Sequence, residues 1–210
     1  MNKIGIFGLS GMALEAADIS RKIGSQPILV ARDKSEKSRY CGDEIVITEE
    51  EALALDDIKF VIGIGDTKIR KAIAEKYSST LQFTNLIHPQ VSFGSGELQK
   101  IESQIGIIVA AGVRVTNNVH IGNFVILNLN ATVSHDTYIG SYTTIAPQAC
   151  VLGNVSVREG AWIGAGAIIN QGRADRPMQI GGYVTIGSGA VVTKDCLNQG
   201  IYVGVPARKI

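Results

Sequence analysis

Residues 115–145 read V-T-N-N-V-H-I-G-N-F-V-I-L-N-L-N-A-T-V-S-H-D-T-Y-I-G-S-Y-T-T-I, and every sixth residue of this stretch is aliphatic. The same register holds at eleven positions in a row: Val109, Val115, Ile121, Leu127, Val133, Ile139, Ile145, Val151, Val157, Ile163 and Ile169. The residue four places later in each repeat, from Val119 to Ala167, is small or β-branched. This period predicts a left-handed parallel β-helix, in which three repeats form one triangular coil and the aliphatic side chains stack inside.

Neither chance nor a β-sandwich accounts for this periodicity. If aliphatic residues filled about a third of all positions, chance would give such a register in far fewer than about one in 10,000 sequences. A β-sandwich would alternate with period two and carry turn signals every roughly 8–12 residues. The register breaks at residues 170–179, N-Q-G-R-A-D-R-P-M-Q, and resumes at Ile180, Ile186 and Val192.

Residues 1–84 follow a different pattern, in which short apolar runs alternate with helical spacing. We expect strands at residues 3–8, 27–31 and 59–65, and helices at residues 12–23, 49–55 and 67–77. Strands that alternate with helices imply a parallel sheet. The predicted fold is therefore a small Rossmann-like α/β domain, residues 1–84, followed by a β-helix domain, residues 85–210.

The composition of the chain excludes several classes of partner and location. The net charge of the 210 residues is +1, so we expect neither nucleic acid nor an anionic membrane as a partner. Cys41, Cys150 and Cys196 show no CxxC spacing and are expected to be reduced thiols. The first apolar stretch runs into Glu15 and Asp18 without a cleavage site, and no apolar run reaches the ~20 residues of a membrane helix. We expect a cytoplasmic protein without membrane insertion.

A histidine–aspartate pair, His135 and Asp136, interrupts the apolar repeat. A carboxylate beside an imidazole favours one tautomer and raises its basicity, which suits a general base. The alternative is an ordinary surface histidine at a corner of the β-helix. His120 is 15 residues from His135 and belongs on another face, so no catalytic metal is expected. His88 precedes the repeats and is expected to be structural.

Three loops of the first domain are candidates for binding a nucleotide. Gly8–Gly11 lies between a strand and a helix, where backbone amides can hold phosphate. The full G-x-G-x-x-G is missing, so a dinucleotide site is not expected and a plain tight turn is the alternative. Asp33 follows the second strand, and Gly63, Gly65 and Asp66 follow the third, so all three loops converge on one sheet edge.

Five stretches together resemble a known family. They are I-G-I-F-G-L-S-G at residues 4–11, G-I-G-D-T-K-I-R-K-A-I at 63–73, N-L-I-H-P at 85–89, N-A-T-V-S-H-D at 130–136 and I-Y-V-G-V-P-A-R-K-I at 201–210. Over nearly its whole length the chain resembles the bacterial sugar acyltransferases of the NeuD and PglD type. These are hexapeptide-repeat N-acetyltransferases that act on UDP-linked 4-amino sugars.

The resemblance implies a role for several residues. His135 would be the catalytic base and Asp136 its acidic partner. The substrate-binding residues would be Gly8, Ser10 and Gly11 at the pyrophosphate, Asp33 near the uridine, Gly65, and Asn128 in the sugar pocket. Acetyl-CoA, the implied co-substrate, would lie between neighbouring prisms against Gly153, Ala165, Gly204, Val205 and Pro206. The family also implies a homotrimer with each active site between two subunits, and we expect such packing to cover the outward-facing side chains of Phe124, Tyr138 and Trp162.

Two departures from the family pattern stand out. Family members often carry a histidine or aromatic residue and then a basic residue after the second glycine of the first turn, where this chain has Met12, Ala13 and Leu14. Backbone amides would therefore make the phosphate contacts. Residues 170–179 form a longer loop than one repeat requires; it is either a solvated surface loop or a flank of the acetyl-CoA groove, with Arg173 and Arg176 near the phosphates.

The resemblance thus predicts a reaction. Acetyl-CoA would acetylate the 4-amino group of a UDP-linked 4-amino-4,6-dideoxy-N-acetyl sugar, giving a UDP-N,N'-diacetylbacillosamine-type product. Alternatives with the same fold are N-acetylation of a GDP- or dTDP-linked amino sugar and O-acetylation of a sialic acid. A non-catalytic β-helix scaffold and a metal-dependent hydratase are alternatives from other classes.

Overall fold

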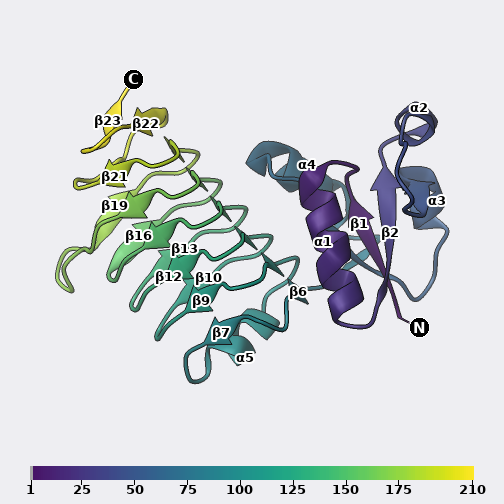
Figure 1. Cartoon of the computed structure of the whole chain (residues 1–210), viewed down its shortest axis with the longest axis horizontal. Coiled ribbons are helices and arrows are strands. Elements are labelled where there is room, and N and C mark those ends of the chain that lie inside the picture. Colours follow the sequence, from purple (N-terminus) through teal and green to yellow (C-terminus); the bar gives the residue numbers. More distant parts are fainter. Residues whose placement is uncertain (1) are drawn as a thin grey trace.

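The computed structural model describes residues 2–210 and contains an α/β domain packed against the side of a triangular prism (Figure 1). The first sheet ends with β5, Gln82–Phe83, which pairs with β4. The prism begins with β6, Leu86–Ile87, which pairs with β8. The predicted fold class, a Rossmann-like domain followed by a parallel β-helix, is confirmed.

The α/β domain has one parallel sheet in the order β3-β2-β1-β4-β5. Its other strands are β1 Lys3–Phe7, β2 Gln26–Ala31, β3 Val46–Thr48 and β4 Lys59–Ile62. Its helices are α1 Gly11–Lys22, α2 Lys34–Ser38, α3 Glu49–Leu53 and α4 Thr67–Tyr77. The structure thus adds α2, β3 and β5 to the predicted elements.

The prism has three faces. Face 1 contains β6, β8 Ile108–Val109, β11 Ile126–Leu127, β14 Thr144–Ile145, β17 Trp162–Ile163, β20 Thr185–Ile186, β22 Ile201–Val203 and β23 Arg208–Lys209. Face 2 contains β7 Ser92–Phe93, β9 Arg114–Val115, β12 Thr132–Val133, β15 Cys150–Val151, β18 Ile168–Ile169 and β21 Val191–Val192. Face 3 contains β10 His120–Ile121, β13 Tyr138–Ile139, β16 Val155–Val157 and β19 Met178–Ile180. Apart from the antiparallel pair β22–β23, all of these strands pair in parallel.

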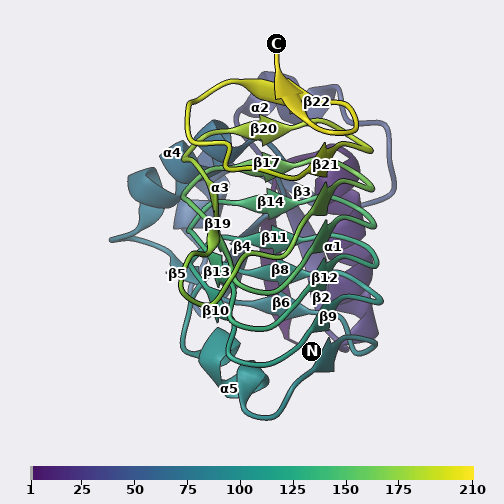
Figure 2. The same ribbon diagram turned by 90° about the vertical axis from the view of Figure 1, so that its left-hand side faces the viewer.

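The period of six follows from the way the coils stack. Each strand pairs with the strand one coil away, so that Leu127 lies opposite Ile145 and Val133 opposite Val151, 18 residues apart. The predicted aliphatic residues form one continuous core along the prism axis. The coils rise from α5, Glu97–Glu102, at one end of the prism to β22 and the C-terminus at the other (Figure 2).

The interruption at residues 170–179 is a short hairpin at the corner between face 2 and face 3. The backbones of Arg173 and Arg176 exchange two hydrogen bonds of 3.0 Å. Their side chains are exposed and each approaches an acid, Asp175 and Asp195 respectively. The prism core continues on both sides of the hairpin, because Ile169 and Ile180 are fully buried.

The α/β domain contacts face 1. Four apolar residues of the prism join the core of the α/β domain: Leu86, Ile108, Ala110 and Ile126. Ala13, Ala16 and Ala17 of α1 contribute to the same cluster, and their small side chains let the helix approach the prism closely. α4 lies on the opposite face of the sheet from α1, because Ala74 and Tyr77 of α4 pack in a separate cluster with Phe7.

Arg70 of α4 joins the two domains. Its side chain is 0% exposed, and its guanidinium donates to oxygens of both domains: Ile64 O (2.6 Å), Gly65 O (2.9 Å), Phe124 O (2.9 Å), Tyr142 O (2.6 Å), Thr143 O (3.3 Å) and Thr144 Oγ1 (2.8 Å). Burial lowers the pKa of Arg70 to about 10, so the group remains a cation at neutral pH. A fully hydrogen-bonded buried cation fixes both partners in one geometry.

One prediction about outward-facing side chains is wrong. Phe124, expected on an exposed face of the prism, is 5% exposed because the α/β domain covers it. Its ring contacts Phe83 edge-on at 5.1 Å and stacks on Tyr142 at 5.4 Å. Tyr138 on face 3 is exposed, as expected, and Trp162 is half-buried.

Within residues 2–210, the helices are all too short or too polar to span a membrane.

We predict that Arg70→Met lowers the free energy of unfolding by about 3–5 kcal/mol, because it leaves several buried carbonyl oxygens without a hydrogen-bond donor. Chemical denaturation measures this change. Lys68→Met, an exposed substitution on the same helix, should change the stability by less than about 0.5 kcal/mol. Equal stability of the two variants would contradict the role given to Arg70.

Candidate active site

His135 and Asp136 lie at the corner between β12 on face 2 and β13 on face 3. In a straight strand, adjacent side chains point to opposite sides. Here Asp136 adopts the left-handed conformation, with φ 55°, and the turn brings the two side chains together. His135 Nδ1 lies 2.8 Å from Asp136 Oδ2, and both side chains are about half exposed. The corner therefore makes the contact that the sequence suggested.

The pair has a defined protonation pattern. A hydrogen bond from the Asn118 amide, followed by the contact with His135, holds the pKa of Asp136 below its usual range. The ionised carboxylate accepts hydrogen bonds only, so Nδ1 of His135 carries the proton that it donates. The other ring nitrogen, Nε2, is then the unprotonated one in the neutral imidazole. This arrangement leaves a base facing away from the carboxylate.

Gly153 lies one coil above and makes room for the imidazole. A Cβ on Gly153 would lie 2.5 Å from Cε1, 2.6 Å from Nε2 and 3.0 Å from Nδ1 of His135. The backbone fixes the same spacing, because Asn154 N donates to His135 O at 3.0 Å. The imidazole therefore rests directly against the Gly153 backbone, and any side chain there would displace it.

Two of the predicted substrate-binding residues, Gly8 and Ser10, line a cavity of about 620 Å³ in the α/β domain. The cavity opens where β1, β2 and β4 end, at the point where the strand order reverses and α/β proteins bind ligands. Gly8 and Ser10 line it together with apolar residues such as Val30 and Ile64. Gly8 has φ 112°, a conformation that favours glycine.

Four charged side chains also line this cavity: Arg32, Glu36, Glu49 and Lys76. Asp33 is not among them. It caps α2 by accepting a hydrogen bond from Glu36 N at 2.8 Å, and it pairs with Arg32 Nε at 3.1 Å. The carboxylates that face the cavity are therefore Glu36 and Glu49, which were not predicted from the sequence. Glu36 sits three residues after a capping aspartate, and that helix-start pattern was the available signal.

Asn128 lies where the prism meets the start of α1. Its Nδ2 is 3.8 Å from Met12 Sδ, and its Oδ1 accepts from Leu129 N at 2.6 Å. Gly11 opens α1 and would have free space around a Cβ. The N-terminus of α1 and Asn128 thus border the same region, at the corner between face 1 and face 2. Gly65 has another position, because its carbonyl accepts from Arg70 and Thr144 at the domain interface.

The structure places the predicted site residues in two groups. His135, Asp136 and Gly153 lie at the corner between faces 2 and 3. Asn128, and Ala165 two coils above it, lie at the corner between faces 1 and 2. Gly204, Val205 and Pro206 are exposed in the last coil. Within one chain, the pair of His135 and Asp136 and the residues near the α/β cavity therefore occupy different corners.

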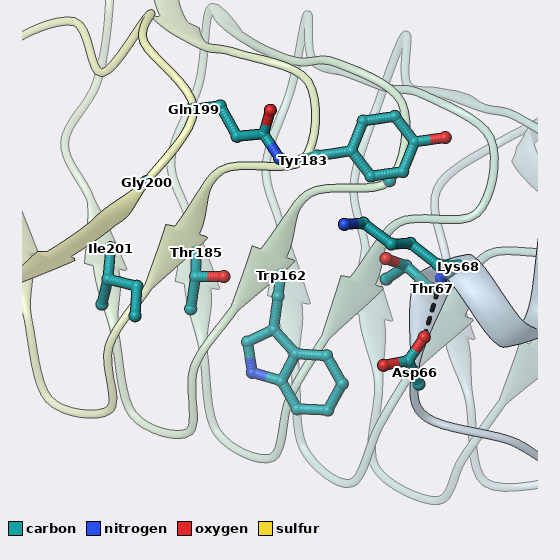
Figure 3. A pocket seen from close by; sticks show the side chains of 10 residues that line it. Asp66, Thr67, Lys68, Trp162, Tyr183, Thr185, Gln199, Gly200 and Ile201 are labelled. Carbon is teal, nitrogen blue, oxygen red and sulfur yellow. Dashed lines mark hydrogen bonds between the residues drawn. The ribbon is translucent and has the colours of Figure 1, made fainter.

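A second cavity, of about 600 Å³, lies between the start of α4 and the upper strands of face 1 (Figure 3). Figure 3 shows Trp162, Thr185 and Ile201 along face 1, with Tyr183, Gln199 and Lys68 across from them. Asp66, noted in the sequence as a residue of the sheet edge, caps α4 by accepting from Lys68 N and Ile69 N at 2.9 Å.

Within the described part of the chain, His, Cys, Asp and Glu side chains form no group of three that could hold a metal ion. His120 stacks on Tyr138 at 4.8 Å on face 3, apart from His135. His88 accepts from Gln90 N through its Nδ1 at 3.0 Å.

Similar proteins share this architecture. Residues 3–77 match the PglD N-terminal domain family. The chain is 33% identical over 195 residues to the GDP-perosamine N-acetyltransferase of Escherichia coli O157:H7, covering 86% of this chain and 84% of that protein. WeeI from Acinetobacter baumannii AYE matches all of both chains with a TM-score of 0.87 and 26% identity. PerB from Caulobacter crescentus, solved in complex with CoA and GDP-perosamine, matches all of this chain and 98% of its own, with a TM-score of 0.84 and 26% identity.

We predict that Gly153→Ala moves the imidazole of His135 while leaving the fold intact, because the new Cβ would overlap the ring. A crystal structure, or a change in the ring resonances of His135 by NMR, would detect the shift. Gly182→Ala is the matched control, since its Cβ would meet no atom closer than 3.3 Å. If the ring of His135 keeps its position in Gly153→Ala, the conclusion that a side chain at residue 153 displaces the imidazole would be wrong.

Proposed function

The chain belongs to the sugar acyltransferases of the PglD type, and we propose that it transfers the acetyl group of acetyl-CoA to the amino group of a nucleotide-linked 4-amino-4,6-dideoxy sugar. Its relative over most of the chain is named as a GDP-perosamine N-acetyltransferase, and PerB binds CoA and GDP-perosamine. The observation that carries the proposal is the contact of 2.8 Å between His135 Nδ1 and Asp136 Oδ2, with the imidazole resting against Gly153.

The chemistry requires a base at one step. The neutral amine of the sugar attacks the thioester carbonyl, a C–N bond forms, and the nitrogen of the tetrahedral intermediate must lose a proton. His135 Nε2 takes that proton while Asp136 orients the ring and stabilises the imidazolium. The C–S bond then breaks, and the departing CoA thiolate recovers the proton from the imidazolium. The backbone amide of Gly153 is a candidate to stabilise the oxyanion.

The nucleotide would bind in the cavity lined by Gly8 and Ser10. Its pyrophosphate would meet the backbone amides at the start of α1, since a helix N-terminus favours phosphate. The sugar would then extend toward Asn128 on the prism. Acetyl-CoA would lie along the prism, with Ala165 and the residues 204–206 near its path. A free sialic acid as acceptor is less well supported, because it would leave the nucleotide cavity without a role.

Two nucleotides are candidates. The sequence resemblance suggests UDP, whereas the relative's name points to GDP. The cavity favours GDP, because the bonds that Glu36 and Glu49 make within the protein go to Oε2, which leaves Oε1 of each for a ligand. Guanine offers an amide N–H and an amino group as donors, whereas uracil offers a single N–H. A GDP-linked amino sugar is therefore the preferred candidate and a UDP-linked one the alternative.

A homotrimer would unite the two groups of site residues. His135 at one corner and Asn128 at another can face one substrate when the corner of one subunit meets the next subunit. Faces 2 and 3 are not covered by the α/β domain, and each exposes an apolar side chain, Ile168 and Tyr138 respectively. Such side chains are typical of surfaces that pack against another subunit.

We predict that His135→Ala reduces acetyl transfer to a 4-amino nucleotide sugar by at least about 10²-fold, the usual contribution of a general base. Release of free CoA thiol measures the rate. Affinity for the nucleotide sugar should stay nearly the same. His120→Ala, a substitution on another face, should keep the wild-type rate, and a His135→Ala enzyme that also keeps it would refute the assigned base.

We predict that GDP binds at least about ten-fold more tightly than UDP, a difference of ~1.4 kcal/mol. Isothermal titration calorimetry on the whole protein measures both constants, with dTDP as a third ligand. Tighter binding of UDP would make the UDP-linked sugar the preferred substrate candidate. It would not contradict the proposed acetyl transfer.

We predict that the protein is trimeric in solution, and multi-angle light scattering gives the mass directly. Fully active monomers would contradict an active site shared between subunits.

A further inference from the structure

The His135–Asp136 pair is connected to the coil below it. Asn118 Nδ2 donates to Asp136 Oδ1 at 2.6 Å, while Asp136 Oδ2 faces His135 Nδ1. The backbone supports the same contact, since Asp136 N donates to Asn117 O at 3.1 Å. Each carboxylate oxygen of Asp136 therefore has one assigned partner, and the orientation of the carboxylate is determined.

Asn118 is itself held by a buried carboxylate. Glu97, the first residue of α5, is 2% exposed, and it accepts from Asn118 N at 2.8 Å and from Val119 N at 3.1 Å. Although burial alone would raise the pKa of Glu97, hydrogen bonds from Lys100 and these two backbone amides hold it below its usual range. An ionised, buried acceptor thus fixes the backbone from which the Asn118 side chain extends.

We propose that Asn118 is a positioning residue for acetyl transfer, which orients Asp136 and through it His135, and that Glu97 holds Asn118 in place. This inference rests on the proposed function, because it takes His135 as the base. It adds Asn118, one coil below the catalytic pair, and Glu97, in the first coil, and neither belongs to a motif recognised in the sequence.

The geometry explains why a positioning residue is needed here. His135 and Asp136 are about half exposed, so water competes for the carboxylate. Without a donor at Oδ1, the carboxylate can rotate about its side-chain bonds and present either oxygen, or neither, to the ring. Asn118 and Asp136 both have left-handed backbones, with φ 54° and 55°, at equivalent places in successive coils. Their side chains consequently stack, and the amide reaches the carboxylate directly.

The chain supplies its own control. Asn154 occupies the equivalent place one coil above, also with a left-handed backbone at φ 55°. Within residues 2–210 its side chain makes no hydrogen bond. Replacing Asn154 by alanine therefore imposes the same backbone strain as Asn118→Ala without removing a contact to Asp136.

The test compares Asn118→Ala with Asn154→Ala in the thiol-release assay. We expect kcat to fall about 10- to 100-fold in Asn118→Ala, with both KM values within about two-fold of wild type, while Asn154→Ala keeps the wild-type kcat. A residue with only a structural role would lower stability in both variants and leave kcat unchanged. Equal kcat values for the two folded variants would overturn the proposal.

Asn118→Asp removes the hydrogen-bond donor without changing the size of the side chain. Aspartate also tolerates a left-handed backbone, so the variant tests the loss of the donor alone. The new carboxylate would face Asp136, near Glu97, Lys100 and His135, and would raise the pKa of Asp136 by like-charge repulsion. We expect kcat to fall and the acid limb of the pH–rate profile to move to higher pH. A profile identical to wild type would overturn the proposal.

A readout that does not depend on turnover keeps this inference distinct from the proposed reaction. NMR of the histidine ring nitrogens reports which nitrogen of His135 carries the proton. We expect a single tautomer, protonated at Nδ1, in wild type and Asn154→Ala, and a mixture in Asn118→Ala. A single tautomer in Asn118→Ala would overturn the positioning role. A mixture in a protein that acetylates no amino sugar would support the positioning role and refute the proposed function instead.

Discussion

The hydrogen bonding of each coil to the next is the constraint on which the structure depends. Parallel pairing in the central coils places each strand residue opposite the one 18 positions away, about 4.8 Å along the prism axis. The same constraint fills the core with stacked aliphatic side chains and aligns the corners into columns. One column holds Asn118, Asp136 and Asn154, and beside it the imidazole of His135 rests on Gly153. A side chain at such a corner is positioned by the whole stack beneath it.

The Arg70 guanidinium fixes the position of the α/β domain against the prism. It donates to carbonyls at the end of β4 and at the corner between faces 3 and 1, so the loops that border the cavity lined by Gly8 and Ser10 keep a fixed position against the prism. Domains joined by a surface contact alone would be expected to move relative to each other. In the proposed reaction, delivery of a bound sugar to the prism would rely on this fixed distance between the proposed nucleotide cavity and Asn128.

The sequence predicts those features that repeat or are adjacent in it. The period of six predicts the prism. His135 and Asp136 can be found in the sequence because these adjacent polar residues interrupt the apolar repeat. The contact between Asn118 and Asp136 was not predicted, because the two residues are 18 positions apart and Asn118 looks like an ordinary turn residue. The burial of Phe124 and the bonds of Arg70 depend on how two domains pack, which neither local spacing nor composition encodes.

A crystal structure of the protein with CoA and an amino nucleotide sugar tests the central claim most directly. We expect the amine nitrogen within about 2.6–3.2 Å of His135 Nε2, the thiol sulfur beside Gly153, and the nucleotide in the cavity lined by Gly8 and Ser10 of a neighbouring subunit. An amine and a sulfur that meet at another part of the prism, such as the cavity beside Trp162, would contradict the assignment of His135 as the base.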